Sequence, residues 1–165
     1  MIWTPERAAL ARASCQMWEG TPHVDRIAKV GVGVDCIKLV HEILVGAGVI
    51  EWREFTGYDV RAGMHSYSDR LRRILCHVLH CDCLPGNTEP LLFGDVLVFT
   101  TGRRSGHVGF YEHIGAPEVA GYIWHALAGH WVTKSDIKLW RSEIDSVIRL
   151  TQVGWKNDPS TAVNL

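Results

Sequence analysis

The sequence has no long run of apolar residues and no block of charges of one sign. Each apolar stretch is interrupted by glycine or by a charged residue well before the roughly 20 residues that a membrane-spanning helix needs. The formal net charge is −1, and no basic segment marks a binding surface for nucleic acid or for an anionic membrane. We therefore expect neither membrane insertion nor a nucleic-acid partner.

The N-terminus also lacks the pattern of a secretory signal peptide, because no basic stretch leads into an apolar segment there. We expect the chain to be made and folded in a cytoplasm, where thiols stay reduced. Its five cysteines are an odd number, which favours free thiols over a disulfide framework. A cysteine nucleophile is compatible with that compartment.

No internal repeat, low-complexity segment or second domain is visible. With 165 residues, of which 47% are apolar and 21% charged, we predict one globular domain over 1–165. Helical spacing of apolar residues is followed by two-residue alternation, which predicts α+β architecture with N-terminal helices on an antiparallel sheet of about five strands. The helices are expected over 5–20, 36–47 and 66–82, and the strands over 95–100, 107–111, 121–126, 131–133 and 146–150.

Cys36 stands where a glycine-rich approach, Gly31 to Asp35, meets the second predicted helix. It shares an apolar stripe with Val40 and Ile43, which points the thiol toward the core. Asp35 occupies the N-cap position, where a carboxylate accepts an N–H group of the first turn. A helix N-terminus stabilises a thiolate, whereas the charge of Asp35 opposes it. A histidine would therefore have to supply much of the activation.

Two histidines, His107 and His125, lie on predicted strands. Alternation places His107 and Gly109 on one face, and the glycine leaves that face open to a substrate or a close helix. If the two strands are neighbours, His125 can reach the second ring nitrogen of His107. The three residues then provide the nucleophile, base and orienting group of a thiol hydrolase. Taken alone, they are also compatible with a buried structural cysteine and ordinary core histidines.

A second cluster, Cys76-His77-Val78-Leu79-His80-Cys81-Asp82-Cys83, contains soft metal ligands. On one helix these side chains divide between two faces, and no paired C-x-x-C motif is present. We interpret the segment as a cysteine-rich amphipathic helix rather than a zinc site, and we expect no metal and no cofactor. The seven tryptophans are assigned to core packing in preference to a glycan- or peptide-binding groove.

Four blocks between residues 7 and 133 resemble, in order, the motifs of the NlpC-type cell-wall peptidases, a papain-like family of thiol peptidases. The Cys36 segment resembles the D-C-x-G-L-V nucleophile motif, and the long stretch that follows it is most similar to the branch found in bacteriophage tail and gene-transfer-agent clusters. The similar blocks are Gly20-Thr21-Pro22-His23 (G-T-P-Y), Gly33 to Val40, the pair Gly94 to Phe99 and Gly106 to Tyr111 (G-D-L-V-F-F and H-V-G-I-Y), and Ile123 to Ala126 (I-H-A).

This resemblance implies that Cys36 is the nucleophile, His107 the general base and His125 the orienting residue. It implies an endopeptidase that cleaves peptidoglycan stem peptides, typically between γ-D-glutamate and a diamino acid. The oxyanion would be held by the Cys36 N–H and by a donor from the upstream loop. In that region we expect His23, Asp35, Lys38 and Gly109 to contribute to oxyanion or substrate binding. His23 replaces the family's tyrosine, and Lys38 replaces its glycine.

The resemblance to the branch found in bacteriophage tail and gene-transfer-agent clusters also implies a biological setting. We expect a component of the virion tail, with bacterial peptidoglycan peptides as substrate and other tail-tip proteins as partners. The main alternative is a catalytically inactive tail-tip assembly protein that retains the fold. Other thiol chemistry on the same scaffold, by an amidase or an acyltransferase, and a zinc-binding module are further alternatives.

Overall fold

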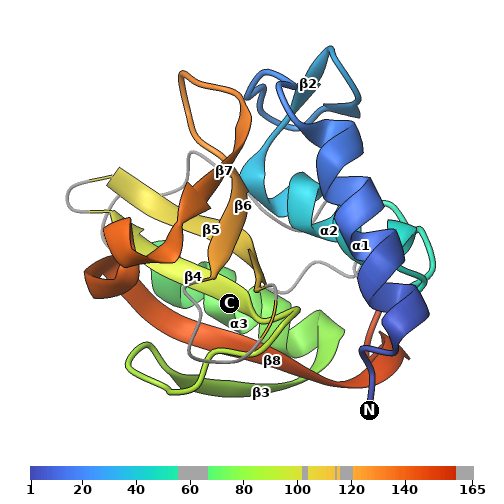
Figure 1. Cartoon of the computed structure of the whole chain (residues 1–165). Coiled ribbons are helices and arrows are strands. Elements are labelled where there is room, and N and C mark those ends of the chain that lie inside the picture. The colour runs from blue at the N-terminus through green and yellow to red at the C-terminus, as the bar shows by residue number, and fades with distance from the viewer. Residues whose placement is uncertain (56–66, 102–103, 114, 116–120, 159–165) are drawn as a thin grey trace.

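The computed structural model describes residues 1–55, 67–101, 104–113, 115 and 121–158. Within these residues, the helices α2 and α3 pack against one antiparallel sheet of six strands in the order β3-β8-β4-β5-β6-β7, and α1 packs against α2 (Figure 1). The α+β architecture predicted from the sequence is confirmed, with one more strand than expected. The elements are α1 (Pro5–Trp18), α2 (Cys36–Gly46), α3 (Tyr67–Val78), β3 (Leu79–Pro85), β4 (Val96–Thr101), β5 (Arg104–Glu112), β6 (Tyr122–Ala126), β7 (Val132–Asp136) and β8 (Ile144–Trp155).

The first two helices begin at side chains that cap them. The hydroxyl of Thr4 accepts the N–H of Arg7 at 3.3 Å, and the carboxylate of Asp35 accepts the N–H of Lys38 at 2.8 Å. Each contact satisfies one N–H group that has no partner within its helix. The start of α2, and with it the position of Cys36, is therefore fixed by the residue that precedes it.

The two faces of the sheet carry separate cores. The larger core lies between the helices and one face, and includes Val108 and Phe110 from β5. The smaller core lies on the opposite face, next to the short 3₁₀ turns η1 (Ile137–Leu139) and η2 (Arg141–Glu143), and includes Phe99 and Tyr111. The predicted alternation along β5 is therefore confirmed, because Val108 and Phe110 face the helices while Tyr111 faces away from them.

The third predicted helix is wrong beyond Val78. Residues 79–82, expected in the helix, instead begin β3 (Leu79–Pro85), which pairs antiparallel with β8 at the edge of the sheet. Residues 79–85 gain ladder hydrogen bonds from β8 that an isolated helical turn cannot offer, so tertiary pairing overrides the local periodicity. In addition, the segment before Cys36 forms a small hairpin of β1 (Ala28–Lys29) and β2 (Gly33–Val34).

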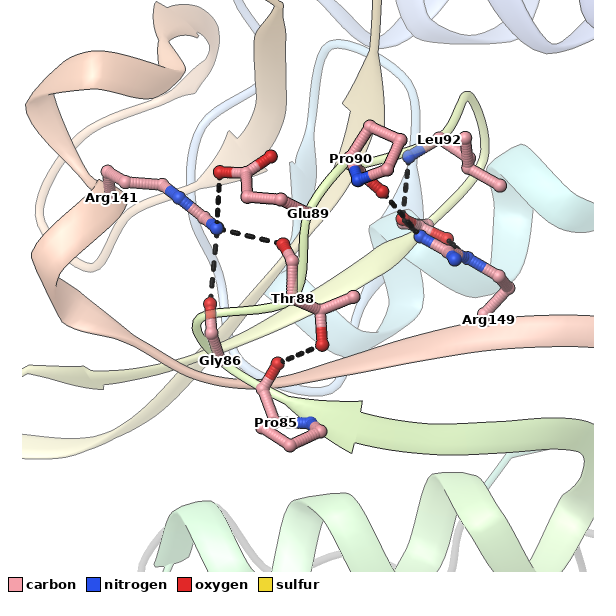
Figure 2. Close-up of polar contacts among 9 residues, drawn as sticks. Pro85, Gly86, Thr88, Glu89, Pro90, Leu92, Arg141 and Arg149 are labelled. Atoms are coloured by element: carbon pink, nitrogen blue, oxygen red, sulfur yellow. Dashed lines mark hydrogen bonds and ion pairs between the residues drawn. The ribbon is translucent and has the colours of Figure 1, made fainter.

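Two arginines fasten the connection between β3 and β4 (Figure 2). Arg149 of β8 binds the buried carboxylate of Asp95 through two N–H groups, at 2.9 and 2.7 Å, and also the carbonyl of Pro90. Arg141 of η2 binds the carboxylate of Glu89 and the carbonyls of Gly86 and Thr88. The connection is thereby held against the sheet, on the side that carries the smaller core. No helix among the described residues is long and apolar enough to span a bilayer.

Candidate active site

The thiol of Cys36 lies at the N-terminus of α2 and is almost enclosed, with 7% of the residue exposed. Backbone N–H groups of Cys36, Ile37 and Val108 are directed at the sulfur. Val108 directly follows His107 in β5, so the thiol lies against the segment of strand that carries this histidine. The N-cap, the helix and the neighbouring strand together determine the position of Cys36.

His107 and His125 come from the neighbouring strands β5 and β6, and their rings are joined by a hydrogen bond. The Nε2 atom of His107 is 2.9 Å from the Nδ1 atom of His125. The Nε2 atom of His125 is in turn 2.9 Å from the Oγ atom of Ser135 in β7. The three side chains form a continuous polar relay across three strands, and its first two members are buried.

Burial controls the ionisation of this site. It lowers the pKa of His107 to about 3, with further lowering from the neighbouring rings of His125 and His23. It also lowers the pKa of His125 to about 4. Burial and, to a smaller extent, the charge of Asp35 raise the pKa of the Cys36 thiol to about 12, against the N–H groups that favour the thiolate. At neutral pH the resting site therefore holds a neutral thiol and a neutral imidazole.

This result differs from the expectation that the helix N-terminus would depress the pKa of the thiol. The dipole effect of a helix end is worth about 1 kcal/mol, which is less than the cost of placing a thiolate in an enclosed apolar site. A neutral imidazole can still accept the thiol proton while the sulfur attacks a substrate. The site is thus suited to general-base activation rather than to a preformed ion pair.

The other residues expected near the oxyanion or substrate occupy distinct positions. The backbone of His23 binds the carbonyl of His130, and its mostly buried ring lies close enough to His107 to affect its pKa. The carboxylate of Asp35 is engaged by the N–H groups of Lys38 and Arg26, so it serves as the helix cap. The side chain of Lys38 is partly exposed at the first turn of α2. The roles of these residues in binding substrate stay predictions.

Gly109 does not lie on an open face, as the sequence suggested, but is closely surrounded by other residues. A Cβ atom at this position would lie 3.2 Å from the carbonyl oxygen of Trp124 and 3.4 Å from the Cβ of His125. It would also contact the ring of Phe99. The glycine therefore permits the close approach of β6 that brings His125 to His107.

Sequence reasoning missed two residues of the site, Ser135 and Trp140. Ser135 falls just beyond the strand predicted over 131–133, which in the structure extends to Asp136. Trp140 lies between η1 and η2, and its ring packs edge-on against His125 with centroids 4.8 Å apart. A longer strand prediction would have placed Ser135 on the sheet next to β6. The position of Trp140 depends on how the chain turns after β7, and no pattern in the neighbouring residues predicts this turn.

Comparisons with known proteins show similarity at the level of structure. No protein-family model matches the sequence. A search of curated proteins likewise found no match. The crystal structure of the NlpC/p60 domain of the peptidoglycan hydrolase SagA matches with a TM-score of 0.52 and 17% sequence identity, covering 87% of this chain and 98% of that chain. At this identity the likeness concerns the fold, and the chain has the mixed α+β, papain-like architecture of that domain.

Proposed function

We propose that the protein is a cysteine peptidase that hydrolyses peptide bonds of bacterial peptidoglycan. The observation that carries the proposal is the hydrogen-bonded pair of His107 and His125, together with a cysteine at a helix N-terminus whose thiol lies against Val108, the neighbour of His107 in β5. The fold that holds them resembles a domain of a peptidoglycan hydrolase, which supports the class of substrate.

In the proposed reaction, Cys36 attacks the carbonyl carbon of the scissile amide and His107 takes the thiol proton. Because Nε2 of His107 is already bonded to His125, the proton goes to Nδ1. The imidazolium then donates this proton to the leaving amine, which releases the first product and leaves a thioester. Water, deprotonated by His107, hydrolyses the thioester and regenerates the thiol. The N–H of Cys36 and the ring of His23 are the proposed donors to the oxyanion.

The bond that is cleaved and the biological setting are inferred from the sequence motifs. We propose that the bond cleaved joins γ-D-glutamate to the diamino acid of the stem peptide. We also propose that the protein acts as part of a bacteriophage-type tail, together with other tail-tip proteins, where it would open the cell wall locally during delivery of the genome.

The test is digestion of purified peptidoglycan, with the released peptides identified by mass spectrometry. We expect Cys36→Ala to reduce the rate by about 10⁴-fold while the fold is retained, because the nucleophile is lost. Cys83→Ser is the matched control, since it removes an exposed thiol outside the site and should leave the rate unchanged. Equal rates for Cys36→Ala and the wild type would contradict the proposal.

One observation favours a second candidate, a catalytically inactive tail-tip protein that retains the fold. The pKa of about 12 keeps the Cys36 thiol protonated in the resting protein, as in an ordinary buried cysteine. This candidate predicts that the wild type releases no peptides from peptidoglycan, while Cys36→Ala leaves assembly into the tail intact. Peptide release by the wild type that depends on Cys36 excludes it.

A further inference from the structure

Three thiols meet at the junction of α3 and β3, away from the candidate active site. The helix ends at Val78 and the strand begins at the next residue, so the chain passes from helix to strand without a loop. Cys76 lies in the last turn of α3, and Cys81 and Cys83 lie two residues apart on β3. In the ladder with β8, Cys81 is opposite Leu150 and Cys83 is opposite Ile148.

This register places both strand cysteines on the face of the sheet that α3 covers. Residues directly opposite each other in an antiparallel pair share a face, and Leu150 and Ile148 belong to the core between the sheet and the helices. Cys76 and Cys81 pack against this same core and are partly buried, whereas Cys83 is exposed. All three side chains thus converge under the end of one helix.

The thiols lie close enough together to shift one another's pKa, and Cys76 interacts with both Cys81 and Cys83. The interaction with Cys76 lowers the pKa of the Cys81 thiol, and the interaction with Cys81 raises that of Cys76. Cys81 is therefore the partner that ionises more readily. Lys156 also favours the thiolate of Cys81, against Cys83 and Asp82. Side chains that pack together at one junction, partial exposure and unequal acidity are the features of an oxidisable pair of thiols.

We propose that Cys76 and Cys81 form a reversible disulfide when the protein meets a low-molecular-weight disulfide oxidant. The thiolate of Cys81 attacks the oxidant, forming a mixed disulfide and releasing one thiolate. Cys76 then loses its proton and attacks the Cys81 sulfur, which releases the second thiolate. The two cysteines are oxidised by two electrons and lose two protons, and the oxidant is reduced to two thiols.

The bond would fasten the end of α3 to the edge strand of the sheet. From β3 to β5, which carries His107, the sheet order is β3-β8-β4-β5, or three strand spacings. At about 4.8 Å for each spacing the two strands are about 14 Å apart. The thiol pair is therefore a site separate from Cys36, and the proposal is independent of the proposed peptidase activity.

Peptide mapping of the full chain tests the proposal. The protein is treated with oxidised glutathione, alkylated, unfolded and cleaved by chymotrypsin after Leu79 and by an endoproteinase specific for the bond before Asp82. These cuts separate Cys76, Cys81 and Cys83 into different peptides. We expect a peptide pair joined through Cys76 and Cys81, lighter by two hydrogens than the separate peptides and lost on reduction with dithiothreitol.

The variants assign the bond. Cys81→Ser should abolish the joined peptides, whereas Cys83→Ser should retain them. A wild-type protein that gives no joined peptides, or one that joins Cys76 to Cys83, overturns the proposal. So does stoichiometric zinc in the reduced wild-type protein that is lost in Cys81→Ser, because the thiols would then be metal ligands. The wild-type map is decisive even if a variant fails to fold.

Discussion

The hydrogen bonds of His125 determine where protons lie in the candidate site. If His107 accepts the thiol proton at Nδ1, its Nε2 carries a hydrogen and donates to Nδ1 of His125. His125 then carries its own hydrogen on Nε2 and donates it to the hydroxyl oxygen of Ser135. In this arrangement the hydroxyl accepts a hydrogen bond that stabilises the tautomer of His125 needed for His107 to act as a base. Ser135 is thus a positioning residue, two hydrogen bonds away from the reacting group.

We expect Ser135→Ala to lower kcat by roughly fivefold, because a hydrogen bond worth about 1 kcal/mol no longer favours the productive tautomer. KM should stay unchanged, since Ser135 bonds to His125 rather than to substrate in this arrangement. Ser135→Thr, which keeps the hydroxyl, should restore kcat. The control is Ser142→Ala, which removes an exposed hydroxyl from η2. Wild-type kcat in Ser135→Ala would show that the hydroxyl does not position His125.

At the scale of elements, the close pairing of β5 and β6 brings the two histidines together. We expect Gly109→Ala to destabilise the protein by about 1–3 kcal/mol, because the added methyl group crowds the backbone of Trp124 and the side chain of His125. The displacement of β6 should also lengthen the contact between the two rings and lower the rate of peptide release. Chemical denaturation and the peptidoglycan assay measure the two effects. Wild-type stability in this variant would contradict the tight packing described for Gly109.

The connection between β3 and β4 provides a second prediction at this scale. We expect Arg149→Ala to reduce the free energy of unfolding by about 3 kcal/mol, because it leaves the buried carboxylate of Asp95 without its cation. Arg141→Ala is the matched comparison in Figure 2, since its partner Glu89 is largely exposed. For Arg141→Ala, the free energy of unfolding should fall by about 1 kcal/mol. Urea denaturation measures both variants, and equal losses would contradict the importance of burial.

Local signals predicted the elements that local physics controls. The caps at Thr4 and Asp35 and the stripe on α2 depend on residues within one or two turns, and these helices start where the sequence indicates. The relation of His107 to His125 was predictable only on the assumption that their strands are neighbours. The predictions fail where contacts between distant segments determine the structure. Pairing with β8 makes residues 79–82 a strand instead of the predicted helix, and the turns after β7 bring Trp140 to His125.

At the scale of the whole molecule, the buried histidines couple folding to pH. The pKa values of about 3 for His107 and about 4 for His125 lie below the ordinary value of 6.5. Between pH 6.5 and these values, the unfolded chain binds protons that the folded chain excludes, so acidification favours unfolding. Glu112 acts at lower pH, because its hydrogen bonds to Trp124, Lys134 and Arg12 depress its pKa below the ordinary 4.5. Glu112 stabilises the folded protein at pH values above the pKa that its carboxyl group has in the unfolded chain. This stabilisation is lost as the pH falls through the lower pKa of the folded chain.

We therefore expect the thermal midpoint to fall as the pH is lowered from 7 to 4, with the decline beginning near pH 6.5 rather than near 4.5. Replacing both buried histidines, His107→Gln together with His125→Gln, should flatten the profile between pH 6.5 and 4.5, because no group that must stay uncharged remains in the relay. The decline below pH 4.5 should persist, since Glu112 is untouched. His130→Gln, which changes an exposed histidine, should keep the wild-type profile. A double variant that retains the full decline from pH 6.5 would place the source of acid sensitivity outside the candidate site.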